Sequence, residues 1–117
     1  MNTAGSNLPA LFRPVVTERP SLVGDGCADP VISLLSERGW AIVATPEANT
    51  HCTSPDGRVY VGWLPEDTAA WRRGIVWTVQ ATPAEGDAEP WVQEFGPDIP
   101  SRAVAGFLEA LISHADR

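Results

Sequence analysis

The chain carries four residues that could bind a metal or act as a thiol nucleophile and its base: Cys27, His51, Cys52 and His114. They form no CxxC or HxxxH pair, the spacings that bring two ligands to one metal ion. His51 and Cys52 are neighbours, so in a strand their side chains point to opposite faces of the sheet. The sequence therefore predicts no metal and no cofactor, and it favours buried thiols and surface imidazoles.

A cysteine–histidine hydrolase would use the same residues. It needs an activated thiolate, an orienting residue and oxyanion donors, and no pattern in the chain indicates them. The sequence also lacks a serine elbow, a phosphate-binding loop and a dinucleotide-binding glycine pattern. The adjacent carboxylates Glu66 and Asp67 fall in a turn-like segment, where such pairs are usually solvated. We therefore expect that the protein is not an enzyme.

Tryptophan is the unusual residue of this chain, with five among 117 residues. Four of the five lie in or beside expected strands, where they can fill the core of a small domain. Alternatively, some of them lie on a sheet face that no helix covers, where they would bind a partner chain or stack on bases. The five are Trp40, Trp63, Trp71, Trp77 and Trp91.

Two segments have the pattern of helices. In the first, Asp29 is the expected N-cap, Pro30 takes the first helical position, and Gly39 stands where a left-handed residue ends a helix. The second, within residues 99–117, repeats apolar residues at helical spacing: Val104, Phe107, Leu108, Leu111 and Ile112. A helix with one apolar face that follows a run of strands is expected to cover one face of their sheet.

The chain between the two helices has the alternation of strands. We expect four of them, over residues 40–45, 57–64, 74–82 and 90–96. The segment SPDG (residues 54–57) has the composition of a hairpin turn with Gly57 at positive φ, and it joins the short HCT run to the next strand. A helical turn is expected around Ala69 and Trp71, and residues 15–17 could add an edge strand.

The length suits one domain, since a single core usually takes about 100–150 residues. The order of elements and the short connections predict an α+β fold. We expect an antiparallel β-meander of four to five strands, preceded by a short helix and covered on one face by a C-terminal helix. Residues 1–13 are expected to be a loosely ordered arm that docks through Leu8, Leu11 and Phe12, and residues 14–117 to form the domain.

The composition is acidic. Fifteen Asp and Glu oppose eight Arg and no lysine, so the formal net charge is -7. Such a chain repels phosphate backbones and anionic membrane surfaces, so neither nucleic acid nor a membrane is the expected partner. No segment has the length of a membrane span, and the N-terminus lacks the basic and apolar regions of a signal peptide. We therefore expect a cytoplasmic protein whose two cysteines do not form a disulfide.

Five motifs follow one another along the chain: PSLVGDGCADPVISLLSERGW, SPDGRVYVGWLPE, VWTVQAT, PWVQEFG and IPSRAVAGFLEALI. This series resembles a family of actinomycete proteins, common in streptomycetes, that is classed as a domain of unknown function. The resemblance covers residues 20–112 and implies no activity and no catalytic residue. Ile99 stands where the family usually has a threonine, which removes a capping hydroxyl before the last helix. Members often hold two copies of the unit, and this chain holds one.

Two functions remain open. The first is a non-enzymatic protein-interaction module that associates with itself or acts as an adaptor, an immunity-like or a chaperone-like factor. If tandem members pack their two units together, a single unit leaves the same apolar surface open, and a twofold homodimer would bury it. We expect this surface on the face opposite the C-terminal helix, where Gly62 leaves room for another chain. Its expected residues are Tyr60, Gly62, Val76 and Val92.

The alternative is a nucleic-acid-associated accessory protein. It would use sheet aromatics together with Arg58 and with the one local cluster of positive charge, which holds Trp71, Arg72 and Arg73. Salt dependence separates the two functions, because nucleic-acid binding weakens steeply with salt whereas an apolar protein interface does not.

Overall fold

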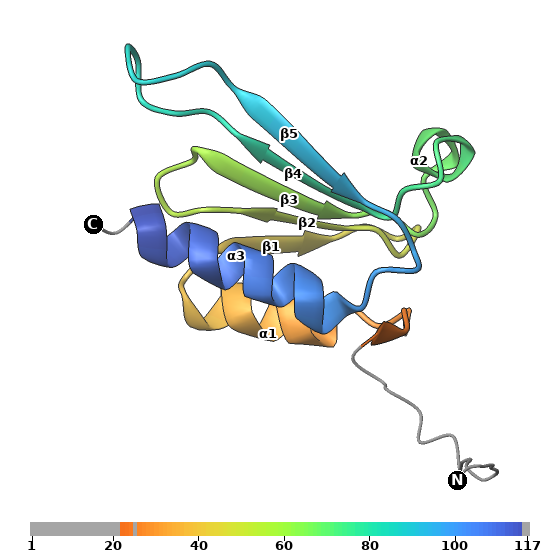
Figure 1. The fold of residues 1–117 in the computed structure, drawn as a ribbon. Helices are drawn as coiled ribbons and strands as arrows, with labels where there is room; N and C mark the ends of the chain where they lie inside the picture. Colours follow the sequence, from red (N-terminus) through yellow and green to blue (C-terminus); the bar gives the residue numbers. More distant parts are fainter. Residues whose placement is uncertain (1–21, 25, 116–117) are drawn as a thin grey trace, which may run out of the picture.

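The computed structural model describes residues 22–24 and 26–115 (Figure 1). The expected arm at residues 1–13 and the expected edge strand at residues 15–17 lie outside the described residues. In chain order the elements are α1 (Asp29–Glu37), β1 (Ala41–Ala44), β2 (Thr50–Thr53), β3 (Val59–Trp63), α2 (Thr68–Arg72), β4 (Trp77–Ala81), β5 (Trp91–Phe95) and α3 (Ser101–Ala115). The predicted α+β class is confirmed.

The strands form one antiparallel sheet of five strands, in the order β1-β2-β3-β4-β5. Each strand pairs with the next one along the chain, so the predicted meander is confirmed. The register places Cys52 opposite Val61 and Val61 opposite Val79. These three side chains therefore share one face of the sheet in adjacent strands.

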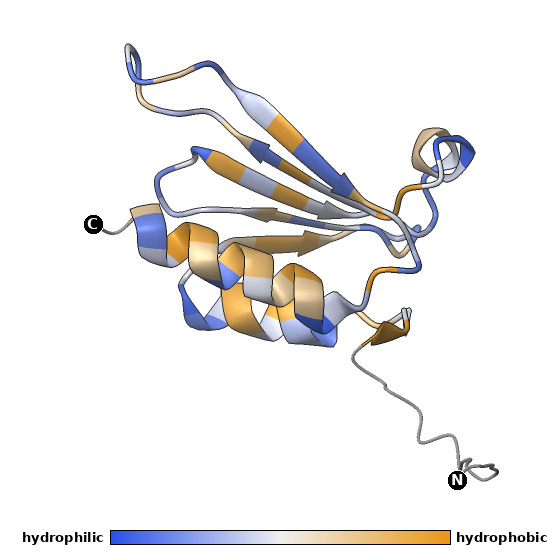
Figure 2. Ribbon diagram, viewed as in Figure 1, coloured by the Kyte–Doolittle hydropathy of each residue, from blue (hydrophilic) through white to orange (hydrophobic). Residues whose placement is uncertain are grey.

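Helices α1 and α3 lie side by side on that same face of the sheet (Figure 1). Hydrophobic and hydrophilic residues alternate along both helices, as expected when one side of a helix is buried (Figure 2). The predicted apolar stripe of α3 is confirmed, since Val104 and Leu108 are fully buried and Phe107 packs against the same core. The fully buried side chains of this core are Val31, Leu35, Cys52, Val61, Val79, Val104 and Leu108.

No helix of the described residues covers the opposite face of the sheet, which we call the helix-free face. By the register, its side chains stand in two rows: Val43, His51, Gly62, Thr78 and Glu94, and Ala41, Thr53, Tyr60, Gln80 and Val92. None of the helices in residues 22–24 and 26–115 is long and apolar enough to cross a membrane.

The caps of α1 differ by one residue from the prediction. Ala28 is the N-cap and Asp29 is already helical, with a proline in the first turn. Asp29 thus contributes a negative charge to the positive end of the helix dipole and makes no side-chain cap. Gly39 has a φ of 81°, so the left-handed residue predicted after the helix is confirmed.

The hairpin turn between β2 and β3 has the predicted geometry. Gly57 has a φ of 75°, and its N–H donates to the carbonyl of Ser54 at 2.9 Å. The Asp56 carboxylate accepts the Ser54 hydroxyl at 2.7 Å and the N–H of Arg58 at 3.0 Å. The bond from Ser54 and then that from Arg58 lower the pKa of Asp56.

The connection from β3 to β4 contains the short helix α2, so the helical turn predicted there is confirmed. The Asp67 carboxylate is its N-cap and accepts the N–H of Ala70 at 2.8 Å. Ala70 is buried, whereas the next residue, Trp71, is 75% exposed. The cap and the buried alanine thus hold Trp71 at the end of the sheet.

Candidate functional site

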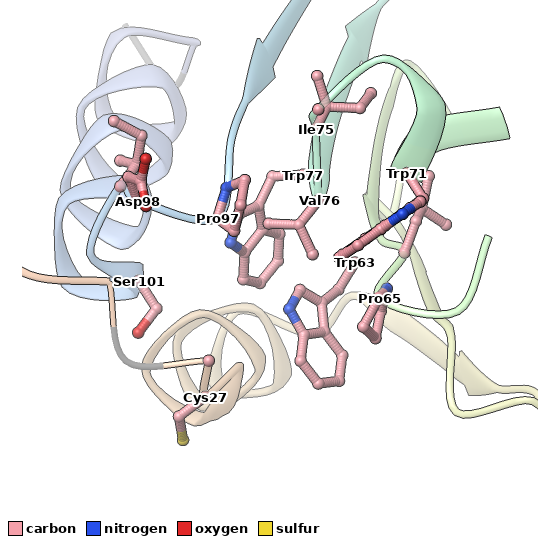
Figure 3. Close-up of a pocket in the computed structure, with 14 residues that line it drawn as sticks. Cys27, Trp63, Pro65, Trp71, Ile75, Val76, Trp77, Pro97, Asp98 and Ser101 are labelled. Atoms are coloured by element: carbon pink, nitrogen blue, oxygen red, sulfur yellow. The ribbon is translucent and has the colours of Figure 1, made fainter. Parts of the chain in front are cut away.

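A cavity of about 610 Å³ opens at the end of the sheet beside α2 (Figure 3). We call it the tryptophan pocket, because its lining includes Trp63, Trp71 and Trp77. The other walls come from the β3–β4 connection, from the chain before α1 at Gly26 and Cys27, and from residues 97–101 between β5 and the first residue of α3. Pockets that bind small ligands usually measure about 300–1,000 Å³, so this cavity can take several side chains or one small molecule.

Pairing of β3 with β4 forms the aromatic wall of the pocket. The register places Trp63 opposite Trp77, with ring centroids 6.1 Å apart and ring planes at 39°. Trp77 is only 2% exposed and belongs to the core, whereas Trp63 is half-buried. In Figure 3 these two rings lie at the centre of the view, with Trp71 to one side and Cys27 and Ser101 to the other.

Most of the remaining lining is apolar. Its larger apolar side chains are Leu64, Pro65, Ile75, Val76, Pro97 and Ile99. The polar side chains in the lining are the Cys27 thiol, the Asp98 carboxylate and the Ser101 hydroxyl. A lining of this kind binds a ligand by burying apolar surface, and a few polar groups fix its orientation.

Two close approaches between backbones hold the loops around the pocket. A Cβ on Gly24 would overlap the carbonyl oxygen of Pro97, and a Cβ on Gly96 would lie 2.9 Å from the carbonyl oxygen of Gly74. Only glycine allows contacts this close. The segment before α1 is therefore packed directly against the loop that precedes α3.

Three of the four residues predicted for a partner surface lie on the helix-free face, namely Tyr60, Gly62 and Val92. Tyr60 and Gly62 lie on the helix-free face, but a Cβ on Gly62 would collide with the phenol oxygen of Tyr60. The predicted open spot at Gly62 is wrong, because the chain's own tyrosine covers it. Val76 lines the tryptophan pocket, and Val92 is 57% exposed on β5.

The Tyr60 side chain is held by a histidine of the neighbouring strand. Its hydroxyl lies 2.6 Å from Nδ1 of His51. Burial raises the pKa of Tyr60, and the charges of Cys52 and Asp67 raise it further. His51 is therefore a half-buried partner of the tyrosine on the helix-free face.

The arginines of the nucleic-acid alternative lie at two ends of the sheet. Arg58 precedes β3 at the hairpin end, whereas Arg72 and Arg73 follow β3 at the α2 end. A strand of five residues spans about 16 Å, so these guanidinium groups do not form one patch. Arg73 also forms an ion pair with Glu94, which offsets its charge.

Cys27 and Cys52 do not form a disulfide. Cys52 is buried in the core, and burial raises the pKa of its thiol to about 11. Cys27 is exposed at the pocket, so the prediction that it is buried is wrong. Within the part of the chain that the structure describes, no three His, Cys, Asp or Glu side chains gather where they could hold a metal ion.

Comparison with known protein families gives a match. The model of the SPDY family, a domain of unknown function (DUF317), matches residues 53–117, more than half of the chain. The chain belongs to this family. The matched residues run from the end of β2 to the end of the chain and include all three tryptophans of the pocket, whereas α1 and β1 precede them. A search of curated proteins and a search of solved structures found no match.

The sequence did not predict the tryptophan pocket as a site. Its walls come from segments that are far apart in the sequence, at Cys27, Trp63, Trp71 and Pro97. Alternation within one strand cannot show that these segments meet. The usable signal was Trp71, an indole within the polar connection PEDTAAWRRG, where a core residue is not expected.

Proposed function

We propose that the protein is a non-enzymatic protein-binding module whose tryptophan pocket receives an apolar segment of a partner chain. The observation that carries this proposal is Trp71, which is 75% exposed at the rim of an apolar cavity of about 610 Å³. Exposed apolar patches of this kind mark interaction sites, and buried tryptophans contribute much of the binding energy at protein interfaces.

The chemistry of the pocket supports binding rather than catalysis. Its described lining has two titratable side chains, Cys27 and Asp98, and no histidine. General acid–base catalysis needs groups that exchange a proton near neutral pH, most often histidine. The lining offers instead a large apolar area with a carboxylate at one place.

The composition of the lining supports an extended apolar segment as the ligand. Grooves lined by aromatic side chains bind proline-containing segments, which lose little conformational entropy when they dock. Trp63 and Trp77 supply adjacent rings, and Pro65 and Pro97 extend the wall. We therefore propose a partner segment that combines proline with leucine or an aromatic residue.

Self-association through the helix-free face is the second proposal for such a module. Val43 and Val92, on the two edge strands, are 60% and 57% exposed, which favours a contact there. Between them stand polar residues such as His51, Thr53 and Gln80. Burial of this face would have to satisfy their hydrogen bonds, so we expect a weaker contact than the pocket provides.

A cytoplasmic location is proposed on chemical grounds. Cys27 is exposed and is not in a disulfide, a state that a reducing compartment preserves.

Selection of peptides tests the proposed function. Short random peptides displayed on phage are selected on the immobilised full-length protein and then measured on the variant Trp71→Ala/Ile75→Ser. We expect selected peptides rich in leucine, aromatic residues and proline that bind this variant about tenfold more weakly or worse. The matched control is Val92→Asp, which changes the helix-free face and should leave their affinity unchanged.

Three outcomes would contradict the proposal. Peptides that bind the wild type and the pocket variant equally would exclude the tryptophan pocket. Peptides that lose affinity only for Val92→Asp would place the interaction on the helix-free face. A selection that enriches no peptide would contradict the binding module itself.

A further inference from the structure

We infer that residues 8–14 of the same chain, Leu-Pro-Ala-Leu-Phe-Arg-Pro, occupy the tryptophan pocket in the free protein and that a partner displaces them. We call residues 8–14 the N-terminal segment. The inference rests on the proposed function of the pocket, because the N-terminal segment and the partner would be recognised by the same chemistry.

The described chain begins at the pocket. Gly26 and Cys27 line the cavity, and Gly24 packs against the loop on its other side. Phe12 lies ten residues before Leu22 in the sequence. Ten extended residues span at most about 33–36 Å, whereas a cavity of this volume is roughly 10 Å across. The N-terminal segment can therefore turn back and reach every wall of the pocket.

The N-terminal segment fits the pocket in apolar character and in charge. It carries three large apolar side chains next to two prolines, which favour an extended backbone suited to an aromatic lining. Arg13 follows directly after Phe12, and Asp98 is the one carboxylate among the lining residues. When Phe12 is buried against the tryptophans, Arg13 can pair with Asp98 at the rim.

The residues next to the pocket do not fill it themselves. Leu22 and Val23 are 65% and 59% exposed, although they are the apolar residues nearest to it in the preceding chain. A tether of this length gives the N-terminal segment an effective concentration in the millimolar range. This exceeds the concentration of a second copy of the protein, so docking within one chain is favoured over exchange between copies.

Docking within the chain lowers the apparent affinity of the partner, because the partner must displace the N-terminal segment. With a local dissociation constant of about 0.1–0.25 mM, a millimolar effective concentration keeps the N-terminal segment bound about 80–90% of the time. The apparent affinity of the partner is then lowered by about 5–10-fold, the inverse of the open fraction.

Cys27 provides a direct measure of occupancy. Its thiol lies in the wall of the pocket, whereas Cys52 is buried with a thiol pKa of about 11 and reacts much more slowly. The rate of Cys27 alkylation by N-ethylmaleimide is measured in the full-length wild type and in Leu11→Ser/Phe12→Ser. We expect the rate to rise about 5–10-fold in this variant, as the open fraction of the pocket rises.

The matched control is Leu22→Ser/Val23→Ser, which removes two exposed apolar side chains outside the pocket and should leave the rate unchanged. A synthetic peptide of residues 7–15, NLPALFRPV, added to Leu11→Ser/Phe12→Ser should slow the alkylation again. Equal rates in the wild type and in Leu11→Ser/Phe12→Ser would overturn the inference. Protection that increases with protein concentration would also overturn it, because the occupant would then be a second copy.

Failure of this inference is distinguishable from failure of the proposed function. If alkylation is insensitive to Leu11→Ser/Phe12→Ser while selected peptides still require Trp71, the pocket binds partners and the N-terminal segment does not occupy it. If selected peptides bind without Trp71, the proposed function fails whatever the alkylation shows.

Discussion

Tyr60 covers Gly62 on the helix-free face, and its hydroxyl lies 2.6 Å from Nδ1 of His51. An alanine at position 62 would collide with the phenol, so the ring would have to move and its hydrogen bond would be lost. We expect Gly62→Ala to lower the free energy of unfolding by about 1–3 kcal/mol, as for other overpacked sites. Urea denaturation followed by circular dichroism measures this change.

A double-mutant cycle isolates the contact between the two residues. In the Tyr60→Ala background the collision with the phenol is absent, and the Thr78 methyl, 3.2 Å from the added Cβ, remains as a close neighbour. Against this contact, an alanine in a strand is more favourable than a glycine by about 0.5–1 kcal/mol. Gly62→Ala should therefore destabilise the protein much less there than in the wild type. An equal loss of stability in both backgrounds would contradict the packing of Tyr60 over Gly62.

At the scale of single residues, the sequence predicted faces but not side-chain directions. Alternation placed Tyr60 and Gly62 on the correct face, because a strand has a fixed period of two. Whether a side chain stands away from the sheet or folds over its neighbour depends on partners in other strands, here His51. Cys27 shows the same limit, because the meeting of two distant loops determines its exposure.

Among the elements, the hairpin turn between β2 and β3 contributes to the free energy of unfolding, and this contribution can be tested at low pH. Hydrogen bonds from Ser54 and Arg58 lower the pKa of Asp56 below its ordinary value of 3.8. Since the folded state favours the charged carboxylate, Asp56 contributes fully to the free energy of unfolding at pH values above 3.8. This contribution is lost as the pH falls through the lower pKa of the folded state.

We therefore expect the urea midpoint of the wild type to fall more steeply than that of Asp56→Asn when the pH is lowered from about 5 to about 2. The asparagine has no charge to lose, and all other carboxylates are shared by the two proteins. Parallel curves would contradict the role of Asp56 in the turn.

The orientation of α3 on the sheet predicts an order of destabilisation. Leu108 is fully buried, whereas Phe107 is half-buried, with its ring centroid 5.5 Å from that of Phe95. We expect Leu108→Ala to lower the free energy of unfolding by about 3–5 kcal/mol and Phe107→Ala by about 2–3 kcal/mol. The exposed Arg102→Ala is the control and should change it by less than about 0.5 kcal/mol. A larger loss for Phe107→Ala than for Leu108→Ala would mean that the helix is rotated.

Most elements could be predicted from local signals. These signals depend on residues that are close in sequence. They are the alternation of apolar and polar residues in the strands, the apolar stripe of α3, the left-handed Gly39 after α1 and the SPDG turn. The sequence places the short HCT run before the hairpin turn but does not predict a strand there. The reason is that β2, THCT, has four residues and little apolar alternation. Its pairing with β1 and β3 makes it a strand, and this pairing is not visible within the segment.

In the whole molecule, α1 and α3 cover the same face, and no helix of residues 22–24 and 26–115 covers the helix-free face between the edge strands β1 and β5, where we propose that a second copy docks. We expect a weak dimer of the wild type in sedimentation velocity at high micromolar concentration, and a monomer for Val92→Asp. A wild type that is monomeric under these conditions would exclude the homodimer. A dimer that Val92→Asp leaves intact would place its interface elsewhere.

The fold class followed from the order and length of the elements, which are properties of the whole sequence. The tryptophan pocket did not follow, because it exists only where the chain before α1, the β3–β4 connection and the loop before α3 meet. Trp63 and Trp77 could equally fill the core by their alternation, and Trp77 does, with 2% exposure. Only Trp71, on a polar connection, indicated a surface role in advance.

The central claim is that the tryptophan pocket binds an apolar segment, and the five tryptophans provide its most direct test. Each indole N–H gives one signal in a ¹⁵N–¹H correlation spectrum, assigned by single Trp→Phe substitutions. The peptide NLPALFRPV is titrated into the full-length Leu11→Ser/Phe12→Ser protein. We predict that the signals of Trp63, Trp71 and Trp77 shift, while Trp40, buried at another part of the core, and Trp91, beside Phe107, stay in place. Shifts at Trp40 or Trp91 without shifts in the pocket, or no shift at any indole, would contradict the account.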